Sequence, residues 1–325
     1  LLDRAGEASG PSAAAGQRLW RTAVTALQAG DIVDDRALYW ARLNRKAEWR
    51  AVAAEDALER FERASRGFHD VRFPAAADAK RVLVTGFDPF HLDVHLDQSN
   101  PSGLAALSLD GRILATENGP AHVEAAVFPV RFEDFDAGMV EDFIEPHLAD
   151  GVDLVVTISM GRDGFDLERF PGRRRSATGP DNLNVLTGAS AETPLLPRLR
   201  GSALEGPEFL EFTLPAEAMT EVEGAFSVRD NRHVATVEHG DFPASSLSGL
   251  SDQTAVRGSG GGYLSNEIAY RSLLANRRVL GPDRRASMGH IHTPRLEGFD
   301  PGFEARVLEQ LEALLIAAVE AATIP

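Results

Sequence analysis

Hydrophobic positions follow two different periodicities along the chain, and the change comes near residue 80. In the first part they recur at i, i+3 or i+4 spacing over 17–29, 35–49 and 55–61. This spacing is typical of amphipathic α-helices that place one apolar face on a core. The first part of the chain therefore predicts three helices.

After residue 80, short runs rich in β-branched residues alternate with helical segments. The strand-like runs are 81–87, 123–130, 152–159 and 287–294. The helical segments are 100–107, 134–148, 265–276 and 301–322. Strands that alternate with helices are typical of βαβ units. We predict an α/β fold, a mostly parallel twisted sheet flanked by helices, with an N-terminal helical extension.

All three tryptophans, Trp20, Trp40 and Trp49, fall in the helical first part. Three short amphipathic helices cannot bury such side chains by themselves. We therefore expect these helices to pack on the rest of the chain or on a partner. The predicted division is a helical extension over 1–79 and an α/β domain over 80–325, with a linker at 74–78.

The chain has 325 residues and a formal net charge of −16, and the acidic excess lies after residue 80. An acidic surface repels phosphate backbones and anionic lipids, so we expect neither nucleic acid nor a membrane as partner. No hydrophobic run approaches the length of a membrane span. The sequence holds no cysteine, which excludes disulfides, cysteine zinc sites and a cysteine nucleophile.

Ser265 follows a cluster of glycines at 258–262 and stands where a helix is predicted to begin. A strand, a glycine turn and a polar residue at a helix start are how α/β enzymes present a nucleophile, because the free N–H groups there favour a developing anion. Serine is also a good N-cap. Taken by itself, this stretch favours Ser265 as an N-cap over Ser265 as a nucleophile.

Glu168, Ser265 and His292 all lie at predicted strand ends or helix starts, where sites in parallel sheets form. A hydroxyl becomes a good nucleophile when a base takes its proton, and histidine suits that role near neutral pH. A carboxylate can fix the histidine tautomer. A surface ion pair for Glu168 and a hydrogen-bonded core role for His292 are the plain alternatives.

A second constellation alternates histidine and aspartate over 91–97. If this segment is extended, His91, Asp93, His95 and Asp97 share one face and suit a divalent metal. An alternating strand edge gives the same string without a metal, and we predict no metal site. A metal-assisted hydrolase remains the alternative.

Eight short motifs make the segment 80–325 resemble the pyroglutamyl peptidase (pyrrolidone carboxyl peptidase) family. In chain order they are VTGFDPF at 84–90, NPS at 100–102, PVRF at 129–132, GR at 161–162 with LER at 167–169, PDN at 180–182, TLP at 213–215, SGGGYLSN at 259–266 and GHIHTP at 289–294. Motifs in the family's order across most of the segment make the resemblance specific.

The resemblance implies an amide hydrolase that removes an N-terminal pyroglutamyl or related acyl group from a peptide. It implies Ser265 as nucleophile, His292 as proton shuttle and Glu168 as its orienting group. Phe87, Phe90, Arg162 and Tyr263 are then expected to bind the substrate, with Arg162 and backbone N–H groups at the oxyanion. No cofactor is expected, and a peptide or small acyl-amide is the expected partner. The family implies a cytoplasmic protein; secretion after removal of a signal peptide and a homo-oligomer stay open.

The departures from the family pattern concern the nucleophile and the substrate loops. Ser265 stands where the family has its catalytic cysteine, and a serine needs stronger general-base help than a thiolate. His91 replaces a glycine, the segments 183–212 and 227–255 are longer, and residues 1–80 have no counterpart. Three interpretations stay open: a serine hydrolase, a natural inactive relative that binds a ligand or partner, and an inactivated variant.

Overall fold

A seven-stranded mixed sheet organises the chain. The computed structural model describes residues 2, 10–74, 79–281 and 286–322. The strand order is β2-β3-β1-β4-β12-β5-β8, and the strands β3, β1, β4 and β12 are parallel to one another. Strand β2 is antiparallel to β3, β5 is antiparallel to β12, and β8 is parallel to β5. The predicted mostly parallel sheet is confirmed, with antiparallel pairs towards its two sides.

The elements have the following bounds. The strands of the main sheet are β1 (Lys80–Phe87), β2 (Ile113–Thr116), β3 (Gly119–Phe128), β4 (Leu154–Met160), β5 (Phe165–Glu168), β8 (Val228–Asn231) and β12 (Ser287–Thr293). The remaining strands are β6 (Arg198–Leu199), β7 (Ser202–Ala203), β9 (His233–Thr236), β10 (Gly240–Pro243) and β11 (Ala255–Arg257). The helices are α2 (Ala13–Gln28), α3 (Arg36–Trp49), α4 (Glu55–Ala64), α5 (Pro101–Leu109), α6 (Phe132–Asp136), α7 (Met139–Ala149), α8 (Ala216–Thr220), α9 (Leu264–Leu280), α10 (Pro301–Ala321) and the 3₁₀ turn η1 (Leu247–Leu250).

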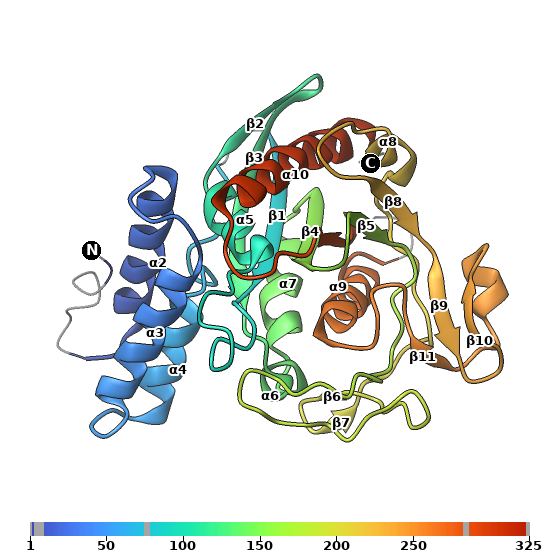
Figure 1. Cartoon of the computed structure of the whole chain (residues 1–325), viewed down its shortest axis with the longest axis horizontal. Coiled ribbons are helices and arrows are strands. Elements are labelled where there is room, and N and C mark those ends of the chain that lie inside the picture. Colours follow the sequence, from blue (N-terminus) through green and yellow to red (C-terminus); the bar gives the residue numbers. More distant parts are fainter. Residues whose placement is uncertain (1, 3–9, 75–78, 282–285, 323–325) are drawn as a thin grey trace.

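Helices cover both faces of the sheet. Figure 1 shows α5 and α10 on one side of the strands and α7 and α9 on the other. The central strands β1 and β4 have almost continuous buried residues, since both of their faces are covered. Strands β9, β10 and β11 form a separate antiparallel sheet beyond β8 (Figure 1). Because β3, β1, β4 and β12 are parallel, their carboxyl ends lie at the same edge of the main sheet, where a site can form.

The three N-terminal helices pack on the rest of the chain. Helices α2, α3 and α4 lie together at one side of the molecule (Figure 1), and their buried side chains belong to the same hydrophobic core as the sheet. Trp20 of α2 is fully buried, and its indole N–H donates to Asp110 at 2.9 Å. Burial raises the pKa of Asp110 to about 7. Residues 75–78 of the predicted linker lie outside the described residues.

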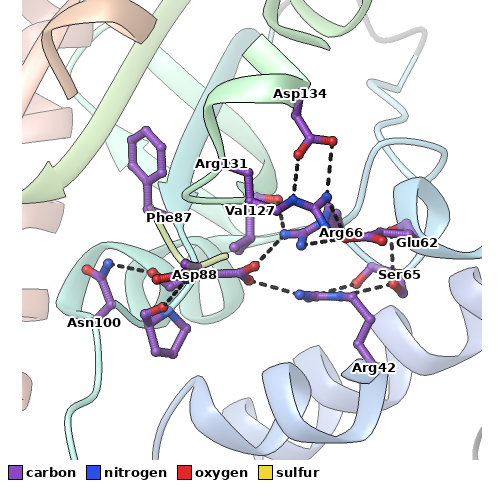
Figure 2. Close-up of polar contacts among 12 residues, drawn as sticks. Arg42, Glu62, Ser65, Arg66, Phe87, Asp88, Asn100, Val127, Arg131 and Asp134 are labelled. Atoms are coloured by element: carbon purple, nitrogen blue, oxygen red, sulfur yellow. Dashed lines mark hydrogen bonds and ion pairs between the residues drawn. The ribbon is translucent and has the colours of Figure 1, made fainter. Parts of the chain in front are cut away.

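A buried ion-pair cluster joins these helices to the end of β1. Figure 2 shows Asp88 between two arginines: Arg42 donates to one carboxylate oxygen at 2.9 Å and Arg66 to the other at 2.8 Å. All three side chains are at most 4% exposed. Burial raises the pKa of Asp88, but the two arginines outweigh it and hold the pKa below its usual value.

We predict that Asp88→Asn destabilises the protein by roughly 3–5 kcal/mol, because it removes the ion-pair partner of buried Arg42 and leaves buried Arg66 with the charge of Glu62, which it shares with other cations. The folded pKa of Asp88 is lower than the unfolded one. Its contribution is therefore present above about pH 4 and is lost as the pH falls through the lowered pKa. Denaturant unfolding of both proteins between pH 7 and pH 3 measures this. Asp56→Asn, which removes an exposed pair with Arg60 on α4, is the matched control and should change nothing. Equal stability of Asp88→Asn and wild type at pH 7 would contradict the role of the cluster.

Candidate active site

A buried carboxylate–histidine pair lies at the ends of two neighbouring strands. Glu168 is the last residue of β5 and is fully buried, while His292 lies near the end of β12 and is 8% exposed. Nδ1 of His292 lies 2.6 Å from Oε1 of Glu168. The side-chain amide of Asn231 donates to the other carboxylate oxygen at 2.8 Å. When Glu168 is ionised it only accepts, so Nδ1 of a neutral His292 carries the proton and Nε2 is left as a base.

The pKa of Glu168 is raised, and the cause is burial. The charge of His292, its hydrogen bond and the amide of Asn231 act in the opposite direction. The fully buried carboxylate is thus held by polar partners on both oxygens. Such a group is well placed to fix one tautomer of the histidine and to stabilise an imidazolium.

The glycine turn before α9 packs against this pair. Gly258 and Gly261 exchange two backbone hydrogen bonds of 3.0 Å, and Gly261 has a φ of 91°, a conformation that favours glycine. The amide of Asn231 donates also to the carbonyl of Ser259 at 3.0 Å, so one side chain ties the turn to Glu168.

Ser265 follows this turn as the second residue of α9. The N-cap position is Tyr263, so the interpretation of Ser265 as a plain N-cap is wrong. The Ser265 hydroxyl donates to the carbonyl of Gly260 at 3.2 Å. Among the described residues no hydrogen bond joins Ser265 to His292. The helix start nevertheless leaves backbone N–H groups free beside the hydroxyl.

A cavity of about 170 Å³ opens beside Ser265. Three further residues singled out in the sequence, Phe87, Phe90 and Tyr263, line it with Ser265. The rest of its wall is Asn100, Val130, Ser159, Met160 and Leu264. Arg162 is exposed and is not among the lining residues, so the structure does not bring it to this cavity.

Ser159 and His290 also belong to this site, although neither of them was assigned a role in it from the sequence. His290 is fully buried beside His292, with ring centroids 4.8 Å apart. Its Nε2 lies 2.8 Å from the hydroxyl of Ser159, which lines the cavity, and its Nδ1 lies 2.8 Å from that of Thr157. Burial, and then the neighbouring His292, hold the pKa of His290 well below its usual value. The spacing of two residues between the histidines places both on one face of β12 and was the available signal.

The histidine–aspartate segment 91–97 forms turns and not a strand. His91 has a φ of 55°, and its ring lies against Phe90 with centroids 3.8 Å apart. The four side chains do not share one strand face. Among the described residues no group of three or more potential ligands could hold a metal ion. The extended conformation on which the metal interpretation depended is therefore wrong.

The chain is similar to known proteins in both of its parts. A family model described as the C-terminal domain of PA0049 matches residues 81–201, and one described as the N-terminal domain of PA0049 matches residues 3–67. The chain is 38% identical over 210 residues to the uncharacterized protein PA0049 of Pseudomonas aeruginosa. That alignment covers 54% of this chain and 38% of the relative, so the chain spans well under half of the relative's length.

Solved structures of pyroglutamyl peptidases are similar to most of the chain. A mutant pyrrolidone carboxyl peptidase of Pyrococcus furiosus is 21% identical and has a TM-score of 0.49, with 74% of this chain and 99% of that chain covered. The pyroglutamyl peptidase I of Bacillus amyloliquefaciens is 21% identical with a TM-score of 0.48, with 75% of this chain and 96% of that chain covered.

Within the described residues, no helix is both long and apolar enough to cross a membrane.

We predict that Gly258→Ala destabilises the glycine turn, because an added Cβ would overlap the backbone nitrogen of Gly172 and the side-chain oxygen of Asn266. Backbone cannot yield as a flexible side chain does, and we expect a loss of roughly 2–3 kcal/mol in the free energy of unfolding. Gly249→Ala is the matched control, since the nearest atom there is 3.8 Å away. Denaturant unfolding compares the two variants. Equal stabilities would mean that the turn is not held as tightly as the structure describes.

Proposed function

We propose that this protein is an amide hydrolase of the pyroglutamyl peptidase type, with residues 80–325 as its catalytic unit. The observation that carries the proposal is the buried pair of Glu168 and His292, 2.6 Å apart, behind the glycine turn that leads to Ser265. The motifs that resemble the family include all three of these residues. The proposed substrate is a peptide or small amide whose N-terminus carries a pyroglutamyl or related acyl group.

In the proposed reaction the Ser265 hydroxyl attacks the acyl carbonyl carbon while Nε2 of His292 takes its proton. Backbone N–H groups at the start of α9 stabilise the oxyanion of the tetrahedral intermediate. The C–N bond then breaks, and His292 returns the proton to the leaving amine. Water, deprotonated by His292, hydrolyses the acyl-enzyme and regenerates the serine. Glu168 keeps Nδ1 protonated throughout and stabilises the imidazolium.

The cavity beside Ser265 suits a compact acyl group. Phe87, Phe90 and Tyr263 offer aromatic surface, and a volume of about 170 Å³ is smaller than a typical drug-sized pocket. Before attack, the Ser265 hydroxyl has to leave the carbonyl of Gly260 and turn towards His292. We assign this movement to a rotation about the Cα–Cβ bond of Ser265. Hydrogen bonds between catalytic groups are often completed only when substrate binds.

A second candidate is a binding protein that keeps the pocket without turnover. The hydrogen bond from the Ser265 hydroxyl to Gly260, rather than to His292, favours this candidate. In such a protein the cavity would hold the blocked N-terminus of a peptide. The two candidates differ in what they require at residue 265, since a binder tolerates alanine there and an enzyme does not.

We predict that wild type hydrolyses a fluorogenic pyroglutamyl amide and that Ser265→Ala lowers kcat by at least about a thousandfold. Ser265→Cys, measured beside them, supplies a nucleophile that ionises more readily next to a histidine. If wild type does not hydrolyse the amide and Ser265→Cys does, the result would favour an inactive relative with an intact pocket. Full activity of Ser265→Ala would overturn the proposed mechanism.

We predict that Glu168→Gln lowers kcat by roughly two to four orders of magnitude and leaves KM within a few-fold, because the residue orients His292 and does not touch the substrate. Steady-state kinetics on the same amide separate the two constants. Glu192→Gln, on an exposed segment, is the control and should behave as wild type. A rise in KM with unchanged kcat would assign Glu168 to substrate binding instead.

A further inference from the structure

A second cavity, of about 50 Å³, lies where the N-terminal helices meet the end of β1, and we call it the interface cavity. Its wall includes four basic side chains: Arg42 and Lys46 of α3, Arg66 just after α4, and Arg131 just before α6. Figure 2 shows Arg42, Arg66 and Arg131 converging from these separate segments. None of the proposed catalytic residues lines this cavity.

The interface cavity carries more positive than negative charge. The ion pairs of its four cations are with three carboxylates: Asp88 pairs with Arg42 and Arg66, Glu62 with Lys46, Arg66 and Arg131, and Asp134 with Arg131. One positive charge is thus left over in a chain whose net charge is −16. Burial, together with the neighbouring arginines, lowers the pKa of Lys46 to about 8. An added anion would relieve this repulsion.

Residues of this wall also have hydrogen-bond donors that no described residue uses. Nε of Arg66 is buried and has no hydrogen-bond partner, although the Arg66 side chain is only 3% exposed. An ammonium has three donors, and among the described residues Lys46 donates to Glu62 alone. Arg131 uses Nε and Nη2 in its ion pairs. An unpaired donor is costly when it is buried, and an acceptor in the cavity would accept from the unused donors of Lys46 and Arg131.

We propose that the interface cavity binds the oxyanion group of a small molecule, a carboxylate or a phosphate. Guanidinium and ammonium groups are the side chains that proteins use for such groups. The volume sets the size of the bound group: one water needs roughly 10–15 Å³ by this measure, so the cavity admits a few heavy atoms and not a peptide. Val130 lines both this cavity and the one beside Ser265, so the bound group lies behind the wall of the candidate active site.

Isothermal titration calorimetry on the full chain tests the proposal, with sodium phosphate and sodium acetate titrated separately against sodium chloride at equal ionic strength. We expect wild type to bind phosphate, acetate or both beyond the chloride baseline. The two arms distinguish a phosphate from a carboxylate site. Lys46→Met and Arg131→Met should each weaken binding by roughly tenfold or more, since each removes a charged donor. Circular dichroism checks that each variant is folded.

Two further variants separate a built site from general attraction to positive charge. Lys46→Arg keeps the charge and should retain binding to within a few-fold. Arg60→Met removes an exposed arginine of α4 and should bind as wild type. Absence of binding to both anions in wild type would overturn the proposal, and so would equal binding in wild type and both Met variants. Ser265→Ala should bind normally, because the inference does not depend on the proposed hydrolysis.

Discussion

The structure depends on the burial of one carboxylate, that of Asp88, at the end of the first sheet strand. Its backbone N–H donates to Phe128, its carbonyl accepts from Asn100, and its side chain holds Arg42 and Arg66. A carboxylate at this depth would cost several kcal/mol without counter-charges. Both counter-charges come from the N-terminal part of the chain, Arg42 from α3 and Arg66 from just after α4. The N-terminal part of the chain therefore supplies the charges that let Asp88 be buried. Its arginines also hold the end of β1 in place, and Phe87 at that end lines the cavity beside Ser265.

The candidate active site repeats this arrangement with different partners. Glu168 is buried as completely as Asp88, but its partners are a histidine and an amide and not arginines. Two permanent cations would hold the carboxylate's charge and leave no proton to move. A histidine partner can be protonated and deprotonated near neutral pH, which is what acid–base chemistry requires. Asp88 is thus a buried carboxylate whose partners are permanently charged, whereas the histidine partner of Glu168 can gain and lose a proton.

Periodicity in the sequence predicted the parts of the fold that local patterns determine. The central parallel strands and the helices around them, including the three N-terminal helices, were all predicted in type. The antiparallel insertion of β5 beside β12 was not, because strand pairing depends on contacts far apart in sequence. An extended conformation at 91–97 was considered only as the condition for a metal site, since alternation alone does not distinguish a strand from turns that expose the same residues. Asn231 escaped notice since its role exists only after folding brings it between Glu168 and Ser259.

The buried His290 shows how a neighbour can set the chemistry of a cavity without reaching it. Its low pKa keeps it neutral, so it does not oppose a positive charge on His292. A neutral imidazole has one donor and one acceptor nitrogen. When Nε2 is the acceptor, the Ser159 hydroxyl donates to it and turns its lone pairs to the cavity. When Nε2 carries the proton, Ser159 accepts and its own proton is free for a ligand carbonyl. The hydroxyl of Thr157 can serve either tautomer at Nδ1. The tautomer of His290 therefore decides whether this wall offers an acceptor or a donor to a ligand in the cavity beside Ser265.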